Sequence, residues 1–245
     1  MTKVLIVGAT SAIASETAKC FAQERAELFL VGRNAEKLDA VADDLRVRGA
    51  KRVETLVLDL SNLDGHQEMF DTAVSTLGTL DMLLIAHGTL GDQKLCERSV
   101  TETLKEFTNN CTSVISLLTI SANYFEQQKH GCIAVISSVA GDRGRPSNYV
   151  YGTTKAAVST FLQGLRSRLY KSGVSVVTVK PGLVASPMTA SLKKSPLFAS
   201  PHCVGQGVYQ AMKRGKDVVY LPGYWRLIMF VVRSIPESIF KRLSL

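Results

Sequence analysis

Seven short apolar runs alternate along the chain with longer segments in which apolar residues recur every three to four positions. The first run is followed by a turn at Gly8 and then by apolar residues at Ile13, Ala18 and Phe21, which is the spacing of a helix face. Alternating strands and helices of this kind predict an α/β fold with a doubly wound, parallel, seven-stranded sheet and helices on both faces. The predicted strands are 3–8, 27–31, 53–58, 81–86, 132–137, 174–180 and 217–221.

Length and composition agree with one large hydrophobic core. The chain has 245 residues, of which 46% are hydrophobic, and α/β folds of this size often form a single domain. The sequence shows no internal repeat, low-complexity segment or linker.

The net charge indicates which kinds of partner the chain could bind, and the cysteine content indicates its cellular compartment. A net charge of +8 favours anionic partners such as a phosphorylated cofactor, a phospholipid or nucleic acid. The basic residues are dispersed and form no stripe with interleaved aromatic residues, which argues against nucleic acid. The chain has no C-x-x-C pair and no histidine cluster, so we expect reduced thiols, no metal and a cytoplasmic location. A strand that begins at residue 3 leaves no room for a cleaved signal peptide.

Three polar residues near the middle of the chain are candidates for catalysis. Tyr151 and Lys155 lie four positions apart and therefore share one face of a helix. The ammonium group could favour the phenolate or bond the ribose of a cofactor, and a shift of a tyrosine pKa from 10 to 7 needs roughly 4 kcal/mol. Ser138 follows a predicted strand and could bond a substrate oxygen. An ordinary helix pair is the alternative, because Tyr-x-x-x-Lys is common.

The first strand-to-helix turn is a candidate phosphate-binding loop. Small residues at Gly8, Ala12 and Ala14 allow a pyrophosphate to approach the helix N-terminus. A tight turn without a ligand is equally consistent with this pattern. Arg33 follows the second strand with no acid before Glu36, which favours the 2′-phosphate of NADP over the ribose hydroxyl of NAD, although a solvated loop charge explains Arg33 equally well. The hydroxyl groups of Thr10 and Ser11 add donors nearby, and Asp59 could bond the adenine amino group.

These motifs occur in the order found in a known family. From residue 3 to about 190 the sequence resembles the short, one-domain form of the short-chain dehydrogenase/reductase family. The segment Gly8-Ala-Thr-Ser-Ala-Ile-Ala resembles the T-G-x-x-x-G-x-G loop. The other matching elements are Ala86-His87-Gly88 at the end of N-N-A-G, the helix residue Asn110, Ser138 with Tyr151-x-x-x-Lys155, and Pro181-Gly182-Leu-Val184-Ala-Ser186 in place of P-G-x-V-x-T.

The resemblance implies a Rossmann fold with strand order 3-2-1-4-5-6-7 and an NADP(H)-dependent oxidoreductase that reduces a carbonyl group. It implies that Tyr151 is the general acid or base, that Lys155 holds the nicotinamide ribose and lowers the Tyr151 pKa, and that Ser138 orients the carbonyl. Asn110 would hold a water in a proton relay, and Val184 and Ser186 would meet the carboxamide. The remaining implied cofactor residues are Gly8, Thr10, Ser11, Ala12, Ile13, Arg33, Asn34, Asp59, Leu60, Ala86, His87, Gly88, Pro181 and Gly182.

The sequence departs from the family pattern at two loops. Ala12 and Ala14 replace glycines, and each adds a methyl group near the expected pyrophosphate. Ile85 and His87 depart from the N-N-A-G pattern, and we expect His87 to be a satisfied polar group near the adenine ribose. Since no chemically active group is lost, we predict an active enzyme. The alternative is a non-catalytic member that binds NADP or serves as a scaffold.

The last 23 residues form an apolar and basic tail, 223–245. Its apolar run 227–232 is too short to span a bilayer, which needs roughly 20 residues. Tyr224, Trp225 and Arg226 precede the run and Arg233 follows it, as in helices that lie in a membrane interface. Packing between subunits of a homodimer or homotetramer is the alternative.

The tail and the opening loop also resemble those of reductases that act on keto-sugars linked to a polyprenyl phosphate. This resemblance implies a lipid-linked substrate and a lid at 186–200 over the substrate, within a domain that spans 1–222. The lid contains apolar residues and two cations that could suit a lipid phosphate, although solvated surface lysines are the more common explanation: Met188, Leu192, Lys193, Lys194, Leu197 and Phe198.

Overall fold

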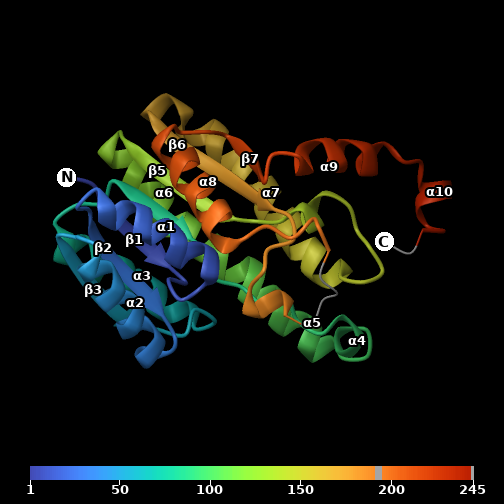
Figure 1. Cartoon of the computed structure of the whole chain (residues 1–245), viewed down its shortest axis with the longest axis horizontal. Helices are drawn as coiled ribbons and strands as arrows, with labels where there is room; N and C mark the ends of the chain where they lie inside the picture. Colours follow the sequence, from blue (N-terminus) through green and yellow to red (C-terminus); the bar gives the residue numbers. More distant parts are fainter. Residues whose placement is uncertain (191–194, 244–245) are drawn as a thin grey trace.

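Seven parallel strands form one sheet in the computed structural model, which describes residues 1–190 and 195–243 (Figure 1). The order β3-β2-β1-β4-β5-β6-β7 confirms the predicted topology. No predicted strand end is displaced by more than one residue. The strands are β1 Lys3–Val7, β2 Glu27–Gly32, β3 Arg52–Val57, β4 Met82–Ile85, β5 Gly131–Ile136, β6 Val174–Pro181 and β7 Val218–Leu221.

Two hydrophobic cores cover the two faces of the sheet. Val4 and Ile6 of β1 face one core, and Leu5 and Val7 face the other, because successive side chains on a strand point to opposite faces. The first core is closed by α1 (Ala12–Gln23), α2 (Ala35–Val47) and α8 (Pro201–Lys213). The second is closed by α3 (His66–Leu77), α6 (Ser113–Gln128) and α7 (Tyr149–Leu169). Burial on both faces explains why the strands read as continuous apolar runs.

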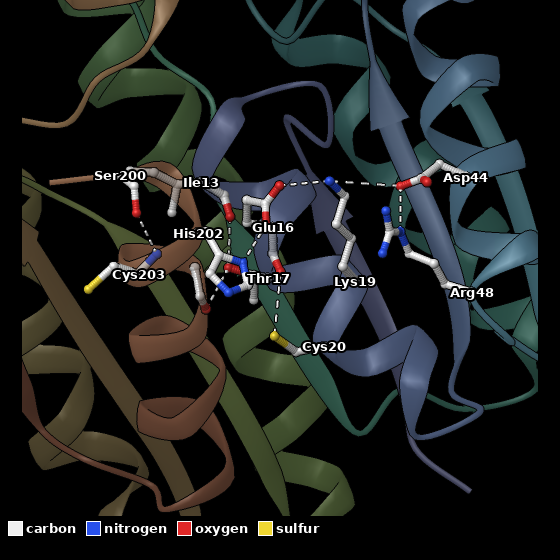
Figure 2. Close-up of polar contacts among 11 residues, drawn as sticks. Ile13, Glu16, Thr17, Lys19, Cys20, Asp44, Arg48, Ser200, His202 and Cys203 are labelled. Atoms are coloured by element: carbon white, nitrogen blue, oxygen red, sulfur yellow. Dashed lines mark hydrogen bonds and ion pairs between the residues drawn. The ribbon is translucent and has the colours of Figure 1, made fainter.

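Helix α1 is tied to the helices on either side of it (Figure 2). The buried Thr17 hydroxyl lies 2.8 Å from the carbonyl oxygen of Ile13 and 3.2 Å from that of Gly205 on α8. A row of polar contacts crosses the surface of the three helices: the hydrogen bond His202–Glu16 and the ion pairs Glu16–Lys19, Lys19–Asp44 and Asp44–Arg48. These surface contacts, which are half-buried at Glu16 and Lys19, contribute little each. The buried Thr17 contact is therefore the stronger restraint on the helix that starts at the first loop.

Shorter helical elements lie in the connections between the long helices and the strands. Helices α4 (Gln93–Cys96) and α5 (Val100–Phe107) precede a π-helical turn, η2 (Thr108–Thr112), that leads directly into α6. The single-turn 3-10 helices are η1 Leu63–Gly65, η3 Val139–Asp142, η4 Tyr170–Ser172 and η5 Pro187–Thr189.

The tail forms two helices, α9 (Trp225–Ser234) and α10 (Glu237–Phe240), which extend away from the sheet (Figure 1). Within residues 1–190 and 195–243, no helix is both long and apolar enough to cross a membrane. In the expected lid 186–200, η5 and a single bridge between Val184 and Ala199 are described. Leu192, Lys193 and Lys194 lie outside the described residues.

Candidate active site

Ser138, Tyr151 and Lys155 meet where β5 ends against the first turns of α7. Ser137 holds this junction, because its hydroxyl donates to the Lys155 carbonyl oxygen at 3.1 Å and is bonded to Ser159 at 2.8 Å. The Ser138 hydroxyl is hydrogen-bonded to the Tyr151 phenol. The Lys155 Nζ lies 5.6 Å from the centre of the Tyr151 ring, one helical turn along α7. The structure thus brings the three predicted residues together.

Burial governs the ionisation of both groups on α7. It raises the pKa of Tyr151 to about 12, although the hydrogen bond with Ser138 acts in the opposite direction. It lowers the pKa of Lys155 to about 8, against the opposing influence of Cys111. In the chain alone, desolvation of the phenolate is therefore the larger effect and outweighs the lowering of the Tyr151 pKa that was expected from Lys155. Lys155 Nζ donates to the Ile136 carbonyl oxygen at 3.1 Å.

Asn110 lies in the π-helical turn between α5 and α6 and is fully buried. Such turns are rare and occur frequently at functional sites. The Asn110 Oδ1 accepts from the Thr89 backbone at 2.9 Å, and its Nδ2 donates to the Glu106 carboxylate at 3.0 Å. A side chain on Gly88 would lie 2.5 Å from Asn110 Oδ1 and 3.5 Å from Lys155 Nζ. The end of β4 is therefore adjacent to both residues.

Thr89 and Glu106 belong to the hydrogen-bond network around Asn110, and neither residue was predicted from the sequence. The Thr89 hydroxyl donates to the buried Glu106 carboxylate at 2.8 Å. The one available signal was that Glu106 lies four residues before Asn110, on the same helix face.

The turn after β1 approaches the turn after β4 so closely that only glycine fits. Gly8 has φ +81°, and a Cβ there would lie 2.5 Å from the His87 backbone nitrogen. His87 Nε2 bonds to the Ser113 hydroxyl at 2.8 Å, whereas its buried Nδ1 has no partner within the described residues. Within the described residues, one ring nitrogen of His87 is thus satisfied and the other is not. Burial lowers the pKa of His87 to about 3, so the ring is neutral at pH 7.

The first turn of α1 supplies donors for a phosphate. The Ser11 hydroxyl caps the helix by accepting from the Ala14 backbone at 3.2 Å. The backbone N–H groups of Ala12 and Ile13 make no hydrogen bond to any residue that the structure describes. Thr10 is exposed beside them. Free N–H groups at a helix N-terminus match the pyrophosphate of a dinucleotide, so the residues present fit this cofactor despite the two alanines.

The loops after β2 and β3 place a cation and an acid at the same rim. Arg33 is exposed, and its charge adds to the hydrogen bonds from Ser61 that hold the pKa of Asp59 below its usual range. Asn34 instead caps α2, since its side chain accepts from the Lys37 backbone at 2.8 Å. Leu60 is buried. Arg33 is therefore the side chain in this group with charge available for a 2′-phosphate.

The segment 181–186 begins at the end of β6. Pro181 is the last residue of that strand, and Gly182 lies against the indole ring of Trp225. Val184 is buried, and the Ser186 backbone donates to the Thr189 hydroxyl at 3.2 Å.

A buried ion pair lies beside the segment 181–186. This pair was not predicted from the sequence. Lys180 Nζ lies 2.5 Å from Asp142 Oδ1, and the Tyr220 hydroxyl donates to Asp142 Oδ2 at 2.8 Å. The network joins β6, η3 and β7. The single sequence signal was a lysine at the end of an apolar strand.

Comparison with known proteins shows to which family the chain belongs. The family model for short chain dehydrogenases matches residues 2–196. The chain belongs to the short-chain dehydrogenase/reductase family. It is an oxidoreductase of this family, whose members generally use a nicotinamide cofactor.

Similar proteins occur in Streptomyces and Mycobacterium. An uncharacterized oxidoreductase of Streptomyces coelicolor is 33% identical over 241 residues, which cover 98% of this chain and 95% of the relative. Another, of Mycobacterium tuberculosis, is 33% identical over 240 residues, covering 98% and 96%. A short-chain type dehydrogenase/reductase from Mycobacterium ulcerans shares the fold with a TM-score of 0.80 at 19% identity, covering 99% of this chain and 98% of that one.

Proposed function

We propose that this short-chain dehydrogenase/reductase is an NADP(H)-dependent carbonyl reductase that converts a ketone or keto-sugar to an alcohol. The observation that carries the proposal is the group formed by Ser138, Tyr151 and Lys155 beside the end of β4. When bound, the reduced nicotinamide supplies a hydride for the carbonyl carbon. Tyr151 donates its phenolic proton to the carbonyl oxygen, and Ser138 bonds the same oxygen. The reverse reaction oxidises the alcohol.

The electrostatics of the buried pair support proton donation. A pKa of about 12 keeps Tyr151 protonated at neutral pH, which is the form that reduction needs. Lys155, with a pKa of about 8, carries its charge at pH 7 and lies beside the ring, where it favours the phenolate that remains after proton transfer. Asn110 and Gly88 adjoin Lys155 and lead toward the carboxyl end of β4.

The cofactor preference is proposed from Arg33. The rim after β2 presents this guanidinium, and Arg suits a phosphate because of its planar, always charged donor group. Separate titrations of NADPH and NADH, followed by nicotinamide fluorescence, should show tighter binding of NADPH. Arg33→Ala should weaken NADPH binding and leave NADH binding unchanged, whereas the exposed Arg98→Ala, far along the chain, should change neither. Equal effects on both cofactors would remove Arg33 from this role.

The catalytic role is tested with Tyr151→Phe. The variant keeps the ring and loses the proton, so it should bind NADPH as tightly as the wild type while turnover falls by about 10² to 10⁴. The assay is NADPH oxidation with a panel of ketones and keto-sugars, including lipid-linked sugars. Unchanged turnover would refute the mechanism. Failure of the wild type to bind either cofactor would instead favour the non-catalytic scaffold alternative.

A further inference from the structure

Helix α9 is fixed to the catalytic region by its buried face. Trp225 and Met229 are 5% and 0% exposed and pack against Val139, the residue after Ser138. A Cβ on Gly182 would overlap the Trp225 indole, so ring and backbone are in direct contact. The helix is therefore not a loosely attached end of the chain.

Arg143 fastens the end of α9 and the start of α10. Its guanidinium donates to the carbonyl oxygens of Val232, Arg233 and Ile235 at 3.4, 3.1 and 2.8 Å. It also pairs with Glu237 at 2.7 Å and lies 4.0 Å from the centre of the Phe240 ring. Because Arg143 follows directly after η3, both tail helices are held by the turn that starts at Ser138.

The opposite face of α9 is apolar and uncovered by any described part of the chain. Leu227, Phe230 and Val231 are 69%, 68% and 54% exposed, and their spacing puts them on one face. The helix extends away from the sheet together with α10 (Figure 1). Ile239 of α10 is also exposed. Grouped apolar exposure of this kind marks an interaction surface.

Basic side chains border this apolar face. Arg226, Arg233, Lys241 and Arg242 are all exposed. Arg226 and Arg233 line a shallow hollow whose other residues are Tyr220, Gly223, Leu227 and Phe230. Among residues 223–243 the single acid is Glu237, which is paired with Arg143. The surface thus combines apolar groups with uncompensated positive charge.

We propose that α9 and α10 dock on a membrane surface that contains anionic phospholipids. Leu227, Phe230 and Val231 would enter the acyl region, and Arg226 would bond lipid phosphate. With 10 residues, α9 is about 15 Å long, half of the roughly 30 Å hydrocarbon core, so it lies in the interface. A symmetric contact with a second copy is disfavoured, because it would bring like-charged arginines together without an acid to match them.

Membrane docking through α9 and α10 does not require the carbonyl reduction proposed above. Docking would place the turns that contain Ser138 and Gly182 near the lipid surface, since both turns contact α9 or Arg143.

Co-sedimentation of the full chain with vesicles tests the proposal. We expect binding to phosphatidylcholine vesicles that contain phosphatidylglycerol, and weaker binding to phosphatidylcholine alone or at high salt. The double variant Leu227→Ser/Phe230→Ser should lose at least about tenfold in binding to the mixed vesicles. Arg226→Ser should lose about fivefold. The matched control Val100→Ser/Leu104→Ser changes two similarly exposed apolar residues on α5 and should bind as the wild type.

Absence of binding to the mixed vesicles would overturn the proposal. So would unchanged vesicle binding by Leu227→Ser/Phe230→Ser, and light scattering that showed this variant as a smaller species would then assign the face to a second copy. NADPH titration and thermal unfolding of each variant establish that the chain is folded and keep this result separate from any failure of the proposed reaction.

Discussion

Burial acts on the tyrosine, the lysine and the histidine of the site according to the charge each would carry. It favours the neutral phenol of Tyr151, weakens the positive charge of Lys155 and keeps His87 uncharged. The chain alone therefore holds a proton donor in its protonated form. Charge that would stabilise a phenolate must come largely from what binds beside these residues.

His87 should make the stability of the fold depend on pH. Its pKa is about 3 in the folded chain and about 6.5 when unfolded. Below about pH 6.5 the unfolded chain binds a proton that the folded chain does not, so the free energy of unfolding falls as the pH drops toward 3. We expect the loss attributable to His87 to reach about 2 kcal/mol at about pH 5.

His87→Asn should make this decline shallower in urea denaturation at about pH 7 and pH 5, because asparagine does not titrate. The surface variant His130→Asn is the control and should leave the slope unaltered. An identical slope in His87→Asn and the wild type would show that the His87 ring is not desolvated in solution. His66 is also buried with a lowered pKa, so a residual slope is expected.

At the scale of elements, the strands were predictable and the contacts between loops were not. A strand that is buried on both faces, such as β1, is a continuous apolar run that ends at a turn residue such as Gly8. The ends of such a strand can therefore be predicted from the sequence. The pairing of Tyr151 with Lys155 followed from helix periodicity. The contacts of Trp225 with Gly182 and of Lys180 with Asp142 join segments 38 or more residues apart, and no local period encodes them.

The π-helical turn around Asn110 should depend on Glu106. Glu106→Ala would leave the Asn110 amide and the Thr89 hydroxyl without this buried acceptor, at a cost of about 1–3 kcal/mol in unfolding free energy. Turnover should fall as well, because Asn110 adjoins Lys155 through Gly88. Glu102→Ala on the same helix removes a half-buried carboxylate that pairs with Lys105, and serves as the control for denaturation and kinetics. Equal stability of the two variants would contradict a structural role for Glu106.

At the scale of the whole molecule, the tail packs against the rest of the chain at Gly182, in addition to its contacts with Val139 and Arg143. A methyl group on Gly182 would displace the Trp225 ring and with it α9. We expect Gly182→Ala to lower the unfolding free energy by about 1–3 kcal/mol, which is typical of overpacking. Gly164→Ala is the matched control, since its Cβ meets nothing within 4 Å on α7 and alanine favours a helix. Thermal unfolding of both variants distinguishes a fixed tail from a loose one, for which Gly182→Ala would be neutral.

Trp225 is also the only tryptophan in the chain. All indole emission therefore originates from one buried ring that lies on the turn expected to face the nicotinamide. Reduced nicotinamide absorbs light in the range where indole emits, so a bound cofactor should quench this emission by energy transfer. Trp225 is thus an intrinsic fluorescent probe for cofactor binding at the point where the tail contacts the rest of the chain. Cofactor binding would therefore be followed in the native chain by the intensity of the Trp225 emission.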